Sequence, residues 1–509
     1  MLRRARRTGT GVMASALIAG CAVGPDFETP PPPDVRALSP VPLNGTGRAG
    51  RDHQAYVHGL DIPRRWWEVF HCRPLDAIVA RAIDGNADLD AARAALRIAD
   101  ANTEAARGAL FPQIGASLDG SSQKPSAAQA RAAGTGTSPY SVSNGQLSVS
   151  FVPDVFGLNR RRVEALAAQA EAQHFELEAA YLTLTSKLAL AAIEEASLRE
   201  QIGSGEESIT IARQVLAILR KQLDAYEASR MDVSAQEVTL AQFEQSLQSL
   251  RKRLAANRDL MAAQTGRFAG EGLPETFDFA CLRLPPELPL SLPSTVVRAR
   301  PDVRAAEANM HAATAEIGVA IANRMPQFNL TANAGASATA IASLATASPA
   351  LLFWSIVGSA TQTLFDGMSA EQKQRAAEAG LDRAAALYRG TVIAAFQSIA
   401  DVLQAIEADR LLFEAADRGV KAARVNLDLT RQVLTQGQVS VLQVLNAQQM
   451  YAQARASHAQ ARAAQRADTV LLFQALGGGW GSQAWRKIAG TAEGWTASVT
   501  RLADQTEKR

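Results

Sequence analysis

The sequence predicts a mainly α-helical fold with a small β part, arranged as an internal duplication. Two long stretches lack proline, residues 158–273 and 368–436. Each stretch follows a pair of short segments in which apolar and polar residues alternate, the pattern of β-strands. Short motifs also recur, because Pro326 follows Pro112 by 214 residues and Gly367 follows Gly157 by 210 residues. A repeat indicates architecture more firmly than any single element does.

The first 20 residues form a predicted signal peptide. They combine an arginine-rich start with an apolar run over residues 11–19 that is too short to span a bilayer. Residues 17–21 match the lipobox of bacterial lipoproteins, in which the Cys21 thiol takes a diacylglycerol and the new N-terminus takes an acyl chain such as palmitate. Ala22 follows instead of an aspartate, which favours the outer membrane. The alternative is a free cysteine in an ordinary signal peptide.

Composition excludes several classes of protein. The 52 Lys and Arg residues nearly balance the 50 Asp and Glu residues, so neither a nucleic-acid-binding surface nor an acidic tail is expected. No run of 18 apolar residues occurs, so we expect no transmembrane helix, and any spanning must be done by strands. Only Cys72 and Cys281 follow Cys21. They could pair in an oxidising periplasm, but the sequence does not show whether they are adjacent.

Motifs for chemistry are also missing from the sequence. The six histidines show no metal-ligand spacing. We find no phosphate-binding glycine loop, no nucleophile elbow and no convergent pair of acids. The sequence therefore predicts no catalytic residue, no metal and no cofactor other than the lipid on Cys21, and the protein is not expected to be an enzyme.

Composition and periodicity divide the chain after the signal peptide. Residues 21–64, rich in proline and glycine, form a lipidated extended arm. The first repeat, 65–273, contains a helix at 74–109, a β-hairpin at 113–153, a long helix at 158–229 and a returning helix from residue 232. Leucines and phenylalanine spaced alternately by three and four residues on the returning helix predict coiled-coil packing.

A second copy of the same order follows a proline-rich connector at 274–298. The second repeat, 299–477, contains a helix at 301–324, a hairpin at 327–365 and a long helix that ends near 436. The chain then turns at Gly437 and returns over residues 440–476, before a C-terminal tail at 478–509.

Four amphipathic strands predict oligomerisation. About eight strands are needed to close a barrel, and lipid does not tolerate an open strand edge. A dimer would supply eight strands and a trimer twelve. One strand face is polar and would line water, and the other is apolar and would meet lipid, with Trp354 as an interfacial aromatic residue. The alternative is a soluble β-layer with one wet face. The polar positions are Gln146, Ser148, Asn329, Thr331 and Asn333.

The chain resembles the outer-membrane factors of tripartite efflux systems, which are TolC-like, and most closely the NodT/OprM-type lipoproteins. Seven motifs carry the resemblance, in order along nearly the whole mature chain. They are Cys21 with residues 23–27 (VGPDF), Trp66-Trp67, residues 154–157 (DVFG), 300–307 (RPDVRAAE), 317–320 (IGVA), 364–367 (LFDG) and 475–480 (ALGGGW).

The resemblance implies a homotrimer with a 12-stranded outer-membrane β-barrel continued by a 12-helix periplasmic α-barrel. The connector and the tail at 478–509 would form an equatorial belt. The trimer would be a passive exit duct for small toxic compounds or drugs, partnered with a periplasmic adaptor and an inner-membrane RND-type pump. Two alternatives remain open: the exit channel of type I-like protein secretion, and a lipid-anchored coiled-coil structural protein without a pore.

The resemblance also implies a periplasmic aperture near the turn that joins the second long helix to its returning helix. Such proteins place two aspartates three residues apart there, often with an arginine three further on. Here Gln443, Asn446 and Gln449 occupy these positions, so we expect an aperture that attracts cations less and is latched more loosely. The alternative is that the amides only solvate a polar tip. In the first copy Asp232 would pair with Arg230 or a neighbouring subunit, or cap its helix.

Overall fold

The computed structural model describes residues 22–31, 54–60, 62–133, 136–290, 299–341, 348–434 and 438–479. Cys21, the signal peptide, Gly437 and residues 480–509 therefore lie outside the described residues. The chain divides into two compact units, and both draw residues from each predicted repeat. Unit 1 comprises residues 1–30, 95–174 and 305–388, and unit 2 comprises residues 31–94, 175–304 and 389–509.

The secondary structure repeats in both order and length. The long helices α5 (Leu158–Asp224) and α10 (Ser369–Leu434) have 67 and 66 residues. The returning helices α6 (Arg230–Gln264) and α11 (Val441–Ala475) have 35 residues each. These near-equal lengths agree with the duplication expected from the sequence. The glycines at 203 and 205 do not interrupt α5.

One predicted helix is in fact two. The predicted helix at 74–109 is split into α2 (Arg73–Gly85) and α3 (Ala87–Arg107), so a single continuous helix is wrong here. Asn86 separates them, because its side-chain oxygen accepts the backbone N–H of Leu89 at 2.9 Å, as a helix cap does. The helix predicted at 301–324 is α8 (Pro301–Ala322).

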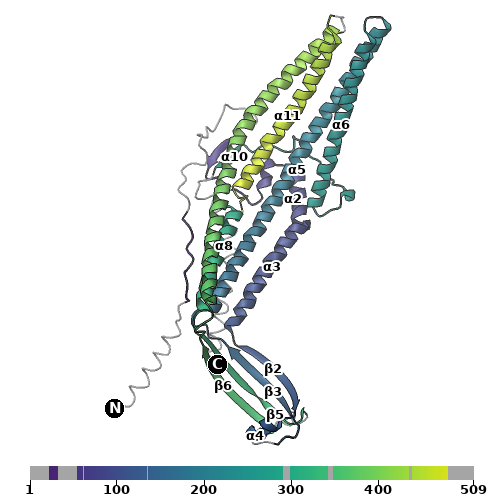
Figure 1. The fold of residues 1–509 in the computed structure, drawn as a ribbon. Coiled ribbons are helices and arrows are strands. Elements are labelled where there is room, and N and C mark those ends of the chain that lie inside the picture. Colours follow the sequence, from purple (N-terminus) through teal and green to yellow (C-terminus); the bar gives the residue numbers. More distant parts are fainter. Residues whose placement is uncertain are drawn as a thin grey trace. The chain divides into compact units, whose positions relative to one another are not determined.

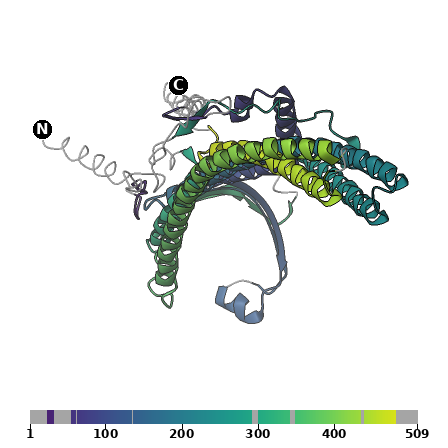
Figure 2. The same ribbon diagram turned by 90° about the horizontal axis from the view of Figure 1, so that it is seen from above.

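Unit 1 contains a four-stranded antiparallel sheet in the order β2-β3-β5-β6. Figure 1 shows the four strands side by side, with the short helix α4 (Ala127–Ala133) at one end, and Figure 2 shows that the sheet is curved. The two predicted hairpins join through β3 and β5, where Leu147 lies opposite Ala334. Strands β2 and β6 are the two edges. The strand bounds are β2 (Gln113–Gln123), β3 (Tyr140–Phe151), β5 (Gln327–Ala338) and β6 (Leu352–Thr361).

The register places apolar side chains on one face of this sheet. Ala116 lies opposite Leu147, and Ala334 opposite both Leu147 and Trp354. Side chains on this face are exposed in the chain, with Trp354 at 77%. On the other face, polar side chains bond across strands, as in Ser150–Asn329 and Asn333–Ser355, each at 3.4 Å.

Capping aspartates begin both long helices directly after the sheet. Asp154 accepts the backbone N–H groups of Asn159 and Arg160 at 3.0 and 2.9 Å. In the second copy, Asp366 accepts the backbone N–H of Ala370 at 2.7 Å. The repeated aspartates therefore terminate strands and start helices.

The core of unit 2 includes Trp66, Trp67 and Phe70 of the 3-10 helix η1 (Trp66–Phe70), all buried. A two-stranded parallel sheet lies in the same unit, formed by β1 (Ala55–His58) and β4 (Glu287–Leu290). We expected an extended arm and a connector at these positions. The pairing was not predicted because parallel partners so far apart in sequence carry no local signal.

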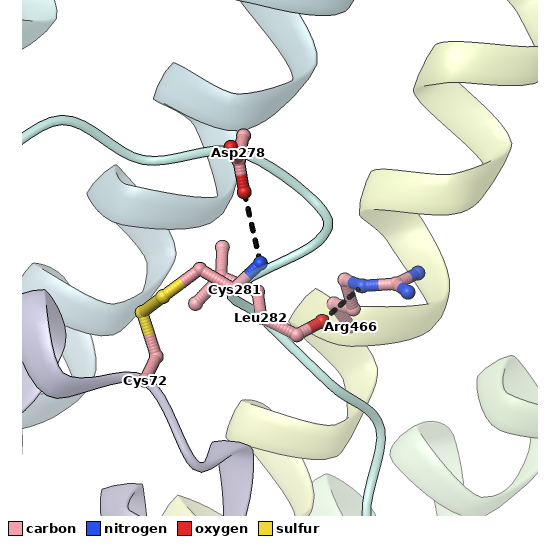
Figure 3. The surroundings of a disulfide bond; sticks show 5 residues. All are labelled: Cys72, Asp278, Cys281, Leu282 and Arg466. Carbon is pink, nitrogen blue, oxygen red and sulfur yellow. Dashed lines mark hydrogen bonds between the residues drawn. A yellow bond between two sulfur atoms is a disulfide. The ribbon is translucent and has the colours of Figure 1, made fainter.

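A disulfide joins Cys72 to Cys281 in unit 2, with 5.1 Å between their Cα atoms (Figure 3). The segment after Cys281 is also held by hydrogen bonds. Asp278 accepts the backbone N–H of Cys281 at 2.8 Å, and Leu282 accepts a bond from the buried Arg466 guanidinium at 2.8 Å. The disulfide closes a separation of 209 residues and therefore fixes the connector to the start of α2.

In the part of the chain that the structure describes, α10 is the one helix with an 18-residue window long and apolar enough to cross a membrane. The sequence-based expectation was that no helix would qualify. Core helices of soluble proteins meet the same criterion, so this window alone assigns no membrane span.

Candidate functional site

The expected aperture lies where α5 meets α6 and where α10 meets α11, in unit 2 (Figure 1). The side chains between these ends form a small apolar cluster that packs the two helix pairs together. Its buried members are Val215, Leu216, Leu219, Val233, Leu434 and Val444. The helices that carry the polar side chains at this end are therefore packed against one another through apolar side chains.

Asp232 belongs to a complete capping box at the start of α6. The Ser229 hydroxyl accepts the backbone N–H of Asp232 at 3.2 Å, and the Asp232 carboxylate accepts the backbone N–H of Ser229 at 3.0 Å. The hydroxyl of Ser229 also donates to this carboxylate at 2.7 Å. These bonds lower the pKa of Asp232. The carboxylate thus stabilises the helix start.

Arg230 is exposed in the first turn of α6, and among the described residues it has no ion pair with Asp232. Its side chain follows the capping serine and projects from the helix end. An exposed guanidinium at this place has donors available for another chain. The pairing of Asp232 with a neighbouring subunit remains a prediction.

Gln443, Asn446 and Gln449 share the exposed face of α11. The opposite face is buried, because Val444 and Ala447 are at most 1% exposed. Within the described residues the three amide side chains make no hydrogen bond, so their donors and acceptors are available to solvent or to another chain. That this face lines a lumen remains a prediction.

The two helix starts differ in their caps. Ser440 is the N-cap of α11 but makes no side-chain capping bond, whereas Ser229 does. Gln443 is three residues after Ser440, the position that Asp232 has relative to Ser229. The amide at this position is therefore not used to cap α11.

A buried amide pair connects the two helix pairs behind the exposed face. The Gln236 amide donates to the carbonyl oxygen of Ala212 at 2.9 Å and to Gln448 at 3.4 Å. Both glutamines are nearly inaccessible to solvent. Since a buried amide without a partner is costly, this pair favours one register of α6 against α11.

An ionic network that sequence reasoning missed connects α10 with α5. Arg424 donates to Glu207 at 2.5 Å, to Asp428 at 2.9 Å and to the Tyr451 hydroxyl at 3.2 Å. Hydrogen bonding, first with Tyr451, raises the pKa of Arg424 above its usual range. Its partners are far apart in sequence, so no local pattern predicts the network.

A metal site is not found among the described residues, where no group of three or more His, Cys, Asp or Glu side chains converges. His458 has two carboxylate neighbours, Glu200 at 3.5 Å and Asp417 at 3.9 Å. Arg462 also contacts Glu200, at 3.2 Å. These contacts join α5, α10 and α11.

Known proteins similar to this chain share its arrangement along most of its length. A family model described as outer membrane efflux protein matches residues 78–267 and 292–478. The pyoverdine export outer membrane protein OpmQ of Pseudomonas putida is 26% identical over 420 residues, which cover 82% of this chain and 88% of that protein. The cation efflux system protein CusC of Escherichia coli is 25% identical over 487 residues, or 91% and 96% of the two chains.

Similarity also extends to solved structures. That of the outer-membrane channel OprN matches with a TM-score of 0.81 at 25% identity, and covers 90% of this chain and 100% of that chain.

Proposed function

Because the chain belongs to the outer membrane efflux protein family, whose members are the outer-membrane channels of tripartite efflux pumps, we propose that three copies form its duct. The protein is an outer-membrane efflux channel that extends into the periplasm, and it is not an enzyme. The trimer would be a passive exit path, and the energy for transport would come from an inner-membrane RND-type pump through a periplasmic adaptor.

The observation that supports oligomerisation is the sheet of unit 1, and the number of three copies comes from the family resemblance. The sheet has two edge strands, β2 and β6, and an exposed apolar face. Unpaired backbone groups at an edge are not tolerated in lipid, so each edge needs a strand from another copy. Three copies supply twelve strands, with the polar, hydrogen-bonded face toward water and the face that carries Trp354 toward lipid.

The proposed anchor is a diacylglycerol and an acyl chain on Cys21. The lipobox order supports it, and the residues that follow Cys21 are held against unit 1. One acyl chain binds a membrane only weakly, whereas several chains together anchor a protein stably.

The proposed aperture consists of Gln443, Asn446 and Gln449, together with Arg230 and Asp232 of the first copy. The exposure of Arg230 and of the three amides supports this role, whereas Asp232 is half-buried in its capping box. Amides form neutral hydrogen bonds, which are about half as strong as charge-assisted ones. We therefore propose an aperture that closes more loosely than a ring of aspartates and arginines would.

The proposed substrates are small toxic compounds. OpmQ is named for pyoverdine export and CusC for cation efflux, so the same architecture conducts chemically different solutes in its relatives. The amides of Gln443, Asn446 and Gln449 fit this breadth, because amides select weakly by charge.

Single-channel conductance in a planar bilayer tests the proposal. The full-length protein should conduct as a heat-modifiable trimer, and Asn446→Asp should conduct less or gate more slowly because carboxylates would strengthen the closure. Asn426→Asp, in the body of α10, controls for the added charge. Equal behaviour of wild type and Asn446→Asp would overturn the aperture, and absence of conductance with the helix ends deleted would overturn the duct.

A further inference from the structure

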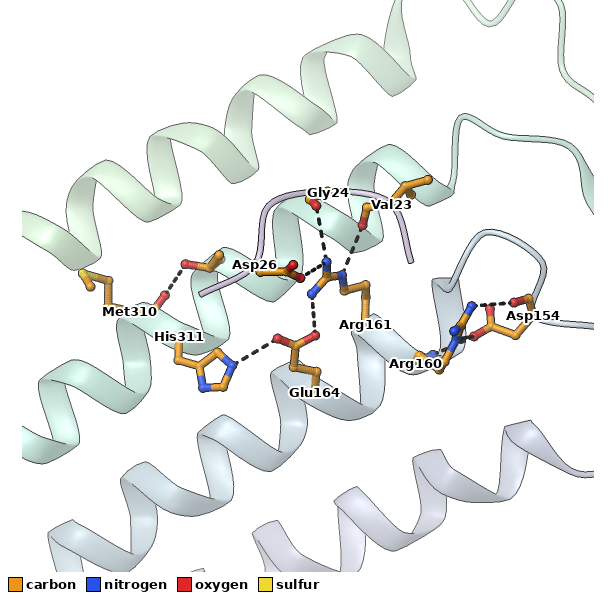
Figure 4. A network of polar contacts seen from close by, with 10 residues as sticks. Val23, Gly24, Asp26, Asp154, Arg160, Arg161, Glu164, Met310 and His311 are labelled. Carbon is orange, nitrogen blue, oxygen red and sulfur yellow. Dashed lines mark hydrogen bonds and ion pairs between the residues drawn. The ribbon is translucent and has the colours of Figure 1, made fainter. Parts of the chain in front are cut away.

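The residues that follow Cys21 lie on unit 1 instead of extending freely (Figure 4). The backbone N–H of Val23 donates to the carbonyl oxygen of Phe156 at 3.1 Å. Phe156 lies between the end of β3 and the start of α5. The first described residues are therefore hydrogen-bonded at the strand-to-helix junction.

Arg161 binds this segment with the Nε and Nη2 atoms of its guanidinium group. It donates to the carbonyl oxygens of Val23 at 3.1 Å and Gly24 at 3.3 Å, and to the carboxylate of Asp26 at 2.7 Å. A fourth bond joins the guanidinium to the carboxylate of Glu164, in the same helix α5, at 2.8 Å and orients the guanidinium. The Arg161 side chain is only 5% exposed, whereas the Asp26 side chain is 90% exposed, so these charge-assisted contacts bury the guanidinium and leave the carboxylate in water.

Burial opposes the charge of Arg161, but its bonds to Asp26 and Glu164 outweigh burial and raise its pKa. The guanidinium is thus fully charged at any pH the protein meets. A lysine could not replace it, because an ammonium lacks the planar set of donors that reaches three acceptors on one segment.

Three glycines allow the segment to approach this closely. Gly24 has φ of +97°, and a Cβ on it would lie 2.5 Å from the Gly318 Cα atom. A Cβ on Gly318 would in turn lie 2.9 Å from the Arg161 side chain. Gly157 has φ of +79°, and a Cβ there would lie 2.7 Å from the Cα atom of Ala22. Any larger residue would separate the backbones.

An aromatic contact completes the binding of the segment. The Phe27 ring stacks on His311 of α8 with 4.5 Å between ring centroids. His311 contacts Glu164 at 3.1 Å, and Glu164 also binds Arg161. The aromatic and ionic contacts therefore support each other.

We propose that Arg161 is a positioning residue that latches residues 22–27 onto unit 1 and so fixes the lipid anchor beside the β3–α5 junction. The inference rests on the proposed lipidation of Cys21. A free arm would let the lipid sample a large volume around the sheet. The latch begins at the residue next to Cys21, which keeps the lipid close to the sheet that must enter the membrane and raises its effective concentration there.

The latch also gives a role to the VGPDF motif at residues 23–27, which is not part of the proposed duct or aperture. Val23 and Gly24 offer carbonyl oxygens, Asp26 offers a carboxylate and Phe27 offers a ring. Gly24 is needed for close approach. These four residues of the motif therefore all contribute to the latch.

Hydrogen–deuterium exchange on the full-length protein in lipid nanodiscs tests the latch. Arg161→Gln should raise the exchange rate of the amides at residues 22–27 by about tenfold to a hundredfold, because charged hydrogen bonds are lost. Gly24→Ala should do the same without changing any charge. Arg162→Gln, which removes the exposed neighbouring arginine, should leave these rates unchanged, and peptides from β3 and α8 should be unaffected in all three variants.

Mass spectrometry of the wild type separates the latch from the lipid. Absence of the lipid mass on Cys21 would overturn the proposed anchor, yet protection of residues 22–27 would still show the latch. Exchange that is unchanged in both Arg161→Gln and Gly24→Ala, or raised equally in Arg162→Gln, would overturn the latch. With lipid present, Arg161→Gln should also lower the fraction of heat-modifiable trimer in the outer membrane, and a trimer fraction equal to that of the wild type would overturn its positioning role.

Discussion

Capping distinguishes two serines that have equivalent places in the two repeats. Ser229 caps α6 through its side chain, and Ser440 does not cap α11. Ser229→Ala should therefore lower the free energy of unfolding by about 1 kcal/mol, whereas Ser440→Ala should change it by much less. Chemical denaturation of both variants measures the difference. Equal losses would contradict the capping assignment.

The cap on α6 also has a pH dependence. Hydrogen bonds from Ser229 lower the pKa of Asp232, so the folded state binds this proton less readily than the unfolded state. The stabilisation is present above the ordinary aspartate pKa of about 3.9 and is lost as pH falls through the lowered value. Asp232→Asn should therefore be less stable than the wild type at pH 7, and the difference should shrink below about pH 4 in thermal unfolding.

The pKa of Asp468 is shifted in the opposite direction from that of Asp232. Burial, and then the nearby carboxylate of Asp409, raise its pKa to about 7. The folded state holds this proton over a range where the unfolded state releases it, so stability falls as pH rises from about 4 to about 7 and then levels off. Asp468→Asn should raise the melting temperature by a few degrees at pH 8 and change it little at pH 4.5.

Thermal unfolding across this range checks the prediction. Asp382→Asn, at an exposed position of α10, is the control and should show no such pH dependence. A variant at Asp468 that is destabilised equally at both pH values would contradict the raised pKa of Asp468 as the cause.

At the scale of elements, periodicity predicted most of the fold. Long proline-free runs became α5 and α10, and alternating segments became the four strands, because both patterns are local. Contacts between distant segments were not predictable. Arg161 binds Asp26 across 135 residues, and β1 pairs with β4 although one was expected in the arm and the other in the connector. In each case the partner follows from packing and has no periodic signal of its own.

In the candidate site, too, the local pattern was predictable from the sequence and some of the side-chain contacts were not. Periodicity predicted that Gln443, Asn446 and Gln449 share a face, and in the structure all three are on the exposed face of α11. Capping of α6 was one of the alternatives that the sequence offered for Asp232, and the structure shows a capping box there. The sequence did not show that Ser440 makes no side-chain capping bond, because that depends on side-chain geometry.

The disulfide joins two elements and should contribute measurably to stability. In the chain-entropy model, closing a long loop stabilises a protein by about 2–5 kcal/mol. Reduction with dithiothreitol, or Cys72→Ser with Cys281→Ser, should lower the melting temperature by roughly 2–5 °C, since a chain of this length has a large unfolding entropy. The reductant should have no further effect on the double variant. An unchanged melting temperature of the reduced wild type would contradict a stabilising role.

At the scale of the whole molecule, two neighbouring residues of β3 test which sheet face meets lipid. Leu147 is on the apolar face, opposite Ala116 and Ala334, and Ser148 is on the polar face, opposite Asn333. An arginine on a lipid-facing position near the bilayer midplane costs about 2–4 kcal/mol, whereas a position facing water tolerates charge.

Leu147→Arg should therefore reduce the amount of heat-modifiable trimer in the outer membrane severalfold, and Ser148→Arg should preserve trimer while altering ion selectivity. Membrane fractionation with unheated gels, followed by conductance of Ser148→Arg, measures both effects. Since the two changes add the same side chain at adjacent positions, general effects of arginine on folding cancel in the comparison. Loss of trimer from Ser148→Arg with none from Leu147→Arg would mean that the polar face meets lipid, which the cross-strand hydrogen bonds on that face argue against.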